Sequence, residues 1–394
     1  MIMRPTDRQP RPWVARARAL AVASAIALPV LAFPGLARAQ SNLSVQGFGF
    51  PTGQFSTRAQ GTGGAVAEMD PFSPINPATI AAFPTRILFF QMEPEYRSVT
   101  TDAGTERTTT ARYPVIFGAL PVGNGVVLSL SASSLLDRTA TTSFSSTQIV
   151  NGESVPMTTT FRINGGLEDV RLAGAWTPKS WLRVGAGLHG ITGNNLIFLT
   201  QSFADSSEFA AFNQQRLLGF HGTAASAGFQ ILSKQVVASA SVRMGGRLSL
   251  RAEDTLIARA NVPNQVGASI AYVGLQNSAI SIRTSHENWS SLGSLGTPGL
   301  RGIDSWDTSL GADIAGPTIN GRLVFLRAGV RTRTLPFQAA NHTVTENSIS
   351  GGLGTAFANG RVLTDLALIR ATRSADLPAS EHAWTLSFGI SVRP

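Results

Sequence analysis

The last fifteen residues of the chain alternate between apolar and polar or small side chains. Trp384, Leu386, Phe388, Ile390 and Val392 occupy one set of alternate positions. A period of two is typical of a strand whose two faces meet different environments. Because the same pattern recurs along most of the chain, we predict an all-β fold.

Turn signals divide this pattern into fourteen predicted strands. These span residues 86–98, 109–120, 125–136, 161–176, 181–192, 216–232, 235–243, 262–274, 278–289, 304–315, 322–334, 344–357, 361–372 and 380–393. Short turns alternate with longer polar loops, which we expect over 99–108, 138–160, 193–214, 244–261, 290–303, 335–343 and 373–379. Short turns on one rim and long loops on the other are typical of a transmembrane antiparallel β-barrel.

Tryptophans stand at the ends of several predicted strands. Trp176 and Trp181 flank a short turn, and Trp306 and Trp384 lie near strand starts. Amphipathic aromatic rings gather at the two membrane interfaces, so these positions fit an aromatic belt. A water-soluble sandwich with buried tryptophans is the alternative, and the loop asymmetry argues against it.

The N-terminal segment has the form of an export signal. Five arginines precede an apolar run over residues 19–33, and Ala37-Arg38-Ala39 forms a small-x-small cleavage site. The run contains Pro29 and is shorter than the ~20 residues that a spanning helix needs. We therefore predict that residues 1–39 are a cleaved signal peptide and that the protein resides in the outer membrane.

The amino-acid composition further restricts the class of protein. Charged residues make up 14% of the chain and hydrophobic residues 43%, without an apolar run long enough for a membrane helix. A closed barrel is then the remaining way to cross a bilayer. The formal charge of +9 comes partly from the signal segment, and the other basic residues are dispersed, so we predict no nucleic-acid partner. The chain has no cysteine, which excludes disulfides and thiolate metal sites.

Residues 40–85 do not show the strand pattern. They are rich in glycine and proline, yet they carry apolar residues such as Phe48, Phe55 and Phe72 that favour burial. We predict that this segment is a plug, or hatch, inside the lumen of a barrel formed by residues 86–394.

The hatch also carries a family resemblance. The run from Ser56 to Ala65, followed by Asp70 and by Asn76-Pro77-Ala78, resembles the N-terminal hatch of the FadL family of outer-membrane transporters. Weaker similarities continue to the C-terminus, among them Val262-Pro263, Trp289 and Arg327-Ala328-Gly329-Val330-Arg331. The resemblance implies a fourteen-stranded barrel with a hatch that takes up small hydrophobic compounds passively, such as fatty acids or hydrocarbons. The implied partners are outer-membrane lipid and that hydrophobic ligand.

Five residues are the expected ligand contacts. Phe72, Asn76 and Pro77 lie in the hatch, and Leu363 and Ile369 fall on the inward face of the strand over 361–372. Apolar side chains that face the lumen suit a pocket for an apolar molecule.

Two prolines fall inside predicted strands. In the FadL family a kinked strand opens a lateral gap through which the ligand leaves the lumen. Pro94 and Pro114 lie inside the first two predicted strands, and proline removes a donor from the ladder. We hypothesise a weak lateral seam between these two strands; the alternative is that both prolines lie near a rim.

Several charged side chains are predicted to point inward. They are Arg183, Arg283, Asp307, Asp313, Arg327, Arg331, Arg333, Asp365 and Arg393. They either guide a carboxylate-bearing ligand or pair with each other and with the hatch. We favour pairing, because lone charges in the lumen need partners.

Other motifs carry little chemistry. Gly185-Ala186-Gly187-Leu188-His189-Gly190 matches G-x-G-x-x-G, but the strand alternation runs through it, so we predict that the inward glycines make room for the hatch rather than bind a nucleotide. The five histidines lack metal-ligand spacing, and a nucleophile elbow is missing. A set of Ser, His and Asp residues far apart in the chain would leave no motif, and nothing in the sequence supports one. Because these motifs are missing, we expect no enzyme activity, cofactor or metal.

A protein-interaction role is the rival function. Barrels resembling PorV act as secretion shuttles, and the Ser/Thr-rich loop over 139–160 would suit a protein partner on the outer face. A continuous apolar cavity beneath the hatch would favour transport, whereas a solidly filled barrel would favour interaction.

Overall fold

The computed structural model describes residues 49–101, 104–150, 153–203, 210–295, 302–339 and 341–394. The predicted signal peptide and residues 40–48 of the predicted hatch lie outside this set. The hatch contains β1 (Phe50–Pro51), α2 (Thr57–Gly61) and η1 (Pro77–Ala82). The wall contains β2 (Ile87–Thr101), β3 (Gly104–Arg112), β4 (Val115–Gly123), β5 (Val126–Asp137), β6 (Ala140–Val150), β7 (Glu153–Lys179), β8 (Leu182–Phe203), β9 (Phe212–Leu232), β10 (Val236–Ala252), β11 (Thr255–Asn261), β12 (Gln265–Leu275), β13 (Ser278–Glu287), β14 (Ser305–Ile319), β15 (Arg322–Ala339), β16 (His342–Phe357), β17 (Val362–Ser374) and β18 (Ala379–Val392), with η2 (Trp289–Leu295) and η3 (Ala358–Gly360) between strands.

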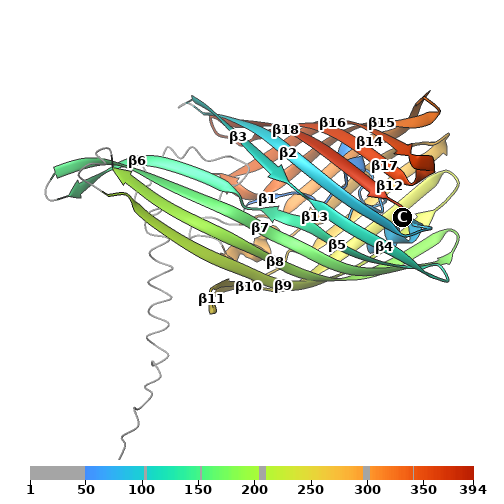
Figure 1. The fold of residues 1–394 in the computed structure, drawn as a ribbon, viewed down its shortest axis with the longest axis horizontal. Coiled ribbons are helices and arrows are strands. Elements are labelled where there is room, and N and C mark those ends of the chain that lie inside the picture. The colour runs from blue at the N-terminus through green and yellow to red at the C-terminus, as the bar shows by residue number, and fades with distance from the viewer. Residues whose placement is uncertain (1–48, 102–103, 151–152, 204–209, 296–301, 340) are drawn as a thin grey trace, which may run out of the picture.

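The wall strands form a closed antiparallel barrel of fourteen strands, as predicted (Figure 1). β18 pairs with β2, which joins the last strand to the first and leaves no open edge at this junction. Three wall positions are each shared by two consecutive segments, namely β3 with β4, β5 with β6, and β11 with β12. The fourteen predicted spans fall on these positions in order.

Several predicted loops are strands instead. Residues 140–150 and 153–163 form a hairpin of β6 and β7 that extends beyond the rest of the wall, and β8 and β9 continue paired to Gln201 and Phe212 (Figure 1). The predictions of loops over 138–160, 193–214 and 244–261 were therefore wrong over most of their length. In the β6–β7 hairpin, polar residues such as Ser143, Ser145 and Ser146 occupy both sets of alternate positions, so no apolar alternation distinguishes it from a loop. In β10, by contrast, Leu248 and Leu250 do alternate with polar residues, and both are buried.

An apolar belt covers the outside of the wall. Leu130, Leu172 and Leu188 are register neighbours on β5, β7 and β8, and each is more than half exposed. Single exposed leucines are common on soluble proteins, but a continuous ring of them fits only a lipid environment. Trp176 and Trp181 are exposed beside the short β7–β8 turn, as the aromatic belt requires.

Replacing Leu172 by arginine should destabilise the barrel by about 2 to 4 kcal/mol in lipid, because a guanidinium would face hydrocarbon near the midplane. Urea unfolding in phospholipid vesicles measures this loss. The matched control is Ser146→Arg on the β6 extension, which should change the free energy of unfolding little. Equal losses for the two variants would show that Leu172 does not face lipid.

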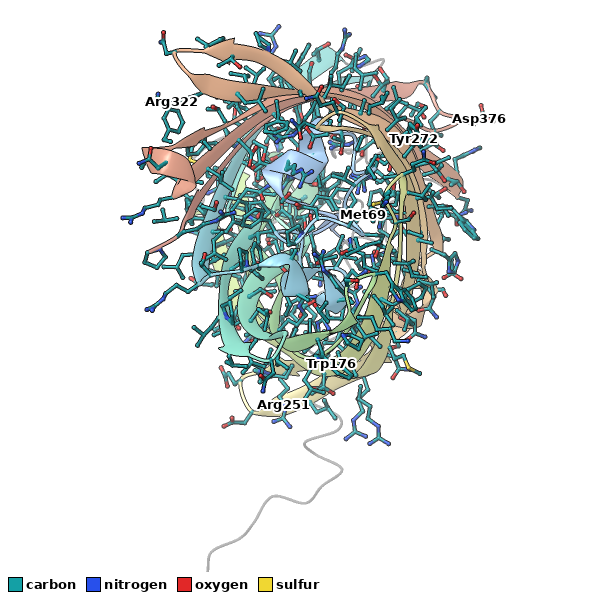
Figure 2. All side chains as sticks on the ribbon, turned by 90° about the vertical axis from the view of Figure 1, so that its right-hand side faces the viewer. Met69, Trp176, Arg251, Tyr272, Arg322 and Asp376 are labelled. Carbon is teal, nitrogen blue, oxygen red and sulfur yellow. The ribbon has the colours of Figure 1, made fainter. Side chains whose placement is uncertain are left out.

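The hatch occupies the lumen. Viewed along the barrel, its short helices and Met69 lie inside the ring of strands (Figure 2). α2 contacts β15 to β18, while η1 contacts β5 and β7 to β9, so the hatch touches both sides of the wall. No helix among the described residues is long and apolar enough to span a membrane.

Candidate functional site

Glycines in the wall let the hatch backbone approach closely. A Cβ on Gly185 would lie 2.5 Å from the carbonyl carbon of Pro77, and one on Gly329 would lie 2.1 Å from the carbonyl carbon of Thr62. The G-x-G-x-x-G run belongs to the uninterrupted strand β8, as expected. Gly185 makes room for the hatch, whereas Gly187 makes room for the wall side chains Arg171 and Ser226.

Paired charges attach the hatch to the wall. The predicted pairing is confirmed for seven of the nine inward charges, with Arg283 and Arg331 on Asp307, Arg327 on Asp313 and Asp365, and Arg333 on Glu346. It is not confirmed for the other two, since Arg183 donates to the amide oxygen of Gln230 and Arg393 has no ion pair among the described residues. Arg58 of the hatch joins this set through Asp313, at 2.9 Å from Nε to Oδ2. Glu68 of the hatch accepts a 2.7 Å hydrogen bond from Ser241. Burial raises the pKa of the Glu68 carboxyl, although Arg283 and Ser241 act in the opposite direction.

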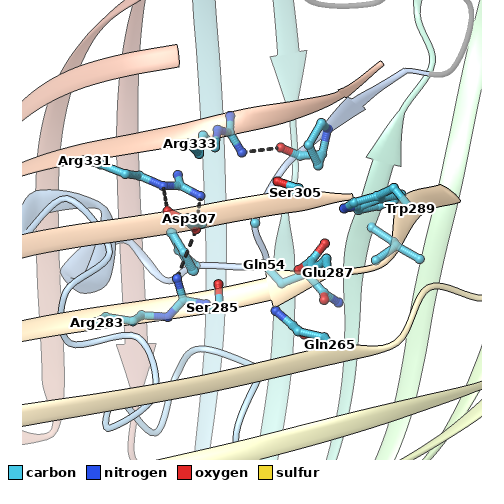
Figure 3. Close-up of a pocket in the computed structure, with 14 residues that line it drawn as sticks. Gln54, Gln265, Arg283, Ser285, Glu287, Trp289, Ser305, Asp307, Arg331 and Arg333 are labelled. Carbon is cyan, nitrogen blue, oxygen red and sulfur yellow. Dashed lines mark hydrogen bonds and ion pairs between the residues drawn. The ribbon is translucent and has the colours of Figure 1, made fainter. Parts of the chain in front are cut away.

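A small polar cavity lies beside these charges (Figure 3). In Figure 3, Arg283 and Arg331 converge on Asp307, while Arg333 reaches the carbonyl of Pro51 at 2.9 Å. The cavity measures about 20 Å³, which holds about one water molecule. The expected apolar chamber does not lie here, because hatch and wall side chains fill this part of the lumen.

Apolar side chains inside the barrel form two large clusters. The outer apolar cluster, toward the long loops, comprises Phe50, Leu135, Leu136, Leu167, Ile191, Phe220, Ala224, Leu248, Leu250, Val262, Trp289, Leu292, Leu335, Phe337 and Val344. The inner apolar cluster, toward the short turns, comprises Phe72, Ile80, Phe83, Ile87, Phe89, Val115, Phe117, Ala119, Val127, Ala173 and Ala175. The outer apolar cluster therefore connects η2 continuously with the hatch strand β1.

The wall is broken between β3 and β5. β4 pairs with β5 as far as Val115 and Ser133, and Ser134 N donates to Pro114 O at 3.0 Å. On the side of Pro114 toward the long loops, β3 has register partners only in β2 among the described residues, and β6 has them only in β7. The hatch strand β1 takes the vacated edge of β5, where Phe50 pairs with Asp137. The break is thus covered from inside by the hatch.

The first two predicted strands are paired apart from one short interruption, where the register partners skip Gln91, Met92 and residues 113–115. β2 and β3 are paired from Glu93 with Arg112 to the strand ends, and Pro94 itself lies opposite Ala111. The register between β2 and β18 skips Glu93 and Pro94, so the irregularity at Pro94 falls on the opposite edge of β2. Pro114 lies in this short interruption, and the longer loss of pairing, toward the long loops, is on the side of β5.

Four arginines surround the ring of Phe50 in β1. Their guanidinium carbons lie 4.3 to 5.5 Å from the ring centroid and belong to Arg97, Arg112, Arg333 and Arg373. Arginine over an aromatic face contributes about 2 kcal/mol when desolvated. We call Phe50 and these four arginines the Phe50 latch, since they hold β1 over the wall break.

A buried acidic group holds the arginines of the latch in place. Glu95 accepts hydrogen bonds from Arg97 at 2.5 Å, Arg112 at 2.6 Å and Arg373 at 3.1 Å. Arg373 also bonds Glu346 at 2.6 Å. The sequence analysis missed this network, although its signal was present: Gln91, Glu93, Glu95 and Arg97 alternate with larger outward residues along β2.

The five expected ligand contacts do not form one site. Phe72 belongs to the inner apolar cluster, and Leu363 packs against it. Ile369 is half-buried on the inward row of β17, and it belongs to neither of the two apolar clusters. Asn76 is fully buried: its amide donates to Glu68 O and Phe229 O, and its oxygen accepts from Ala78 N. The role of Asn76 in this structure is therefore to anchor the hatch, next to Pro77.

Comparison with known proteins shows which solved structures share this fold. No protein-family model and no curated protein sequence matches the chain. Among solved structures, a FadL homologue from Pseudomonas aeruginosa aligns with 88% of this chain and 99% of its own, at 13% identity and a TM-score of 0.61. The chain has the FadL-type fold. The P. putida toluene transporter TodX (14% identity, 87% and 99% covered, TM-score 0.57) and the monoaromatic hydrocarbon channel CymD (14%, 86% and 97%, 0.54) have the same FadL-type fold.

Proposed function

We propose that this FadL-type barrel is a passive outer-membrane channel for small hydrophobic compounds, shown here in its closed state. The observation that carries the proposal is the wall break between β3 and β5, which the outer apolar cluster reaches and β1 covers. The named neighbours TodX and CymD, a toluene transporter and a monoaromatic hydrocarbon channel, support this substrate class.

The path follows from where apolar and charged side chains lie. A hydrophobic molecule captured near Trp289 and Leu292 of η2 stays among apolar side chains as far as Leu136, next to the break. The direct route through the hatch crosses the charges around Glu95, Asp307 and Asp313 instead, which offer an apolar molecule no favourable contact. Lateral release into the membrane is therefore the favoured exit, and it requires β1 to leave β5.

A disulfide between β1 and β5 tests this gate. Pro51 and Leu136 are direct register partners, so cysteines at both positions would lie about 4.5 to 5.5 Å apart at Cα, within disulfide range. The chain has no native cysteine to interfere. We expect the oxidised Pro51→Cys/Leu136→Cys variant to lose uptake of labelled toluene and labelled oleate, and reductant to restore it.

The matched control is Thr284→Cys/Thr308→Cys, a register pair on β13 and β14 remote from the hatch. Its oxidation should leave uptake unchanged. Full uptake by the oxidised Pro51→Cys/Leu136→Cys protein would eliminate β1 as the gate. Comparing the two labelled compounds also distinguishes a hydrocarbon channel from a fatty-acid channel.

A protein-interaction role is the second candidate, and two observations favour it. The lumen cavity holds about one water molecule, and the β6–β7 hairpin projects from the barrel with the outer edge of β6 unpaired among the described residues (Figure 1). Shortening this hairpin by removing residues 143–160 discriminates the two functions. If the barrel is a transporter, uptake should persist in this shortened variant. If the barrel serves protein interaction instead, even the wild-type protein should show no uptake.

A further inference from the structure

Asp169, His189 and Ser226 form a hydrogen-bonded series inside the barrel. Asp169 Oδ1 and Oδ2 lie 2.8 and 3.0 Å from His189 Nδ1, and His189 Nε2 lies 2.8 Å from Ser226 Oγ. The three residues belong to the neighbouring strands β7, β8 and β9, and all three are buried. This is the order of contacts in which a carboxylate orients a histidine and the histidine activates a serine.

The partners determine the tautomer of the histidine. A carboxylate only accepts hydrogen bonds, so His189 Nδ1 must carry the proton that bonds Asp169. A ring that carries its only proton on Nδ1 has a lone pair at Nε2, which can accept the hydroxyl proton of Ser226. Gln54 of the hatch donates to Asp169 Oδ2 at 3.1 Å, and Arg243 lies 3.9 Å from the same oxygen, so the carboxylate is held in place on its other side.

A cation with unused donors lies next to the serine. The Cδ of Arg171 and the Oγ of Ser226 lie 3.3 and 2.8 Å from the position that a Cβ on Gly187 would take. Arg171 is 1% exposed and has no carboxylate at ion-pair distance among the described residues. Its Nη1 donates to Ile75 O at 3.3 Å, whereas its Nε and Nη2 have no hydrogen-bond partner among the described residues. A buried guanidinium with free N–H groups is a donor for a developing oxyanion.

From this geometry we propose that Ser226 is an activated nucleophile that cleaves small apolar carboxylic esters. Ser226 Oγ attacks the ester carbonyl carbon while its proton passes to His189 Nε2, and Arg171 stabilises the oxyanion. The tetrahedral intermediate collapses by breaking the bond to the alkoxy oxygen, which leaves as the alcohol with the proton from His189. Water, activated by the same histidine, then releases the acid and restores Ser226.

The hatch controls access to this nucleophile. η1 packs on β7, β8 and β9, the strands that carry the three residues, and Ile75 contacts Arg171. Loosening the hatch should therefore expose Ser226. Asn76→Ala removes the amide that donates to Phe229 O on β9, which makes it the variant of choice for opening the site.

A fluorophosphonate probe and p-nitrophenyl acetate test the proposal on the full-length protein in detergent. We expect the probe to label Ser226, identified by peptide mass spectrometry, faster in Asn76→Ala than in wild type. Ser226→Ala should lose labelling, and His189→Gln should lower the labelling and hydrolysis rates by about 10² to 10⁴. Arg171→Met should lower kcat for the acetate ester with little change in KM.

The control is Ser239→Ala, which removes a buried lumen serine of β10 that has no histidine partner. It should label and hydrolyse like wild type. Heat-modifiable migration on gels confirms that each variant is folded. Failure of both wild type and folded Asn76→Ala to react, or equal reaction in Ser226→Ala, would overturn the proposal. Toluene and oleate uptake should persist in Ser226→Ala, so this test is independent of the transport function.

Discussion

Replacing Glu95 by leucine is expected to lower the free energy of unfolding of the barrel by about 3 to 5 kcal/mol. The reason is that Arg97, Arg112 and Arg373 all bond this one buried carboxylate. Removing it leaves three guanidinium groups in the lumen with less compensation than their desolvation requires. Urea unfolding in detergent, followed by tryptophan fluorescence, measures the change.

The control for this variant is Glu106→Leu, on an exposed part of β3 in the same region of the wall. Surface substitutions of this kind usually change stability by less than about 0.5 kcal/mol. Glu95→Leu, unlike this control, should also weaken the Phe50 latch. The Glu95→Leu barrel is therefore expected to let small hydrophobic probes through. Similar stability of the two variants would mean that Glu95 does not organise the arginines.

Gly329→Ala is expected to displace the hatch. The new Cβ would lie 2.1 Å from the carbonyl carbon of Thr62 and 2.4 Å from the nitrogen of Gly63. These are backbone atoms that cannot rotate away, so the hatch must move as a body, at a cost of about 1 to 3 kcal/mol or more. We expect higher ion conductance in planar bilayers and greater protease sensitivity of residues 49–85.

Gly351→Ala is the matched control for this change. It lies on the adjacent strand β16, and the nearest atom to its added Cβ is the Arg327 carbonyl oxygen, an ordinary contact at 3.8 Å. Conductance and protease sensitivity should stay at wild-type levels. A normal, protected hatch in Gly329→Ala would contradict the close approach of Thr62 to β15.

The barrel was predictable because its signal is local. Alternation along strands such as β18 depends only on which environment each face meets, and β18 meets lipid on one face while Thr385, Ser387 and Ser391 face the lumen. The prediction failed in the β6–β7 hairpin beyond the apolar belt, where that contrast is lost. The pairing of inward charges was predictable for a similar reason, since a buried charge needs a partner.

The site was less predictable because it depends on contacts between distant segments. Proline identified a weak point at Pro114, but which neighbour it separates depends on register, and the structure assigns the break to β5. Phe50 looked like any apolar hatch residue, and only the fold brings four arginines around it. Phe72 and Leu363 were correctly placed inside, yet they lie in the inner apolar cluster rather than beside the break.

The sequence by itself determined that this chain is a closed, lipid-facing barrel with a folded segment in its lumen, because period, turn spacing and composition report on the environment of each residue one at a time. The tertiary structure alone decided where the wall opens, what covers the opening, and that Asp169, His189 and Ser226 meet on three strands. Those features arise from strand register and hatch docking, which depend on pairs of residues far apart in the chain and leave no periodic trace along it.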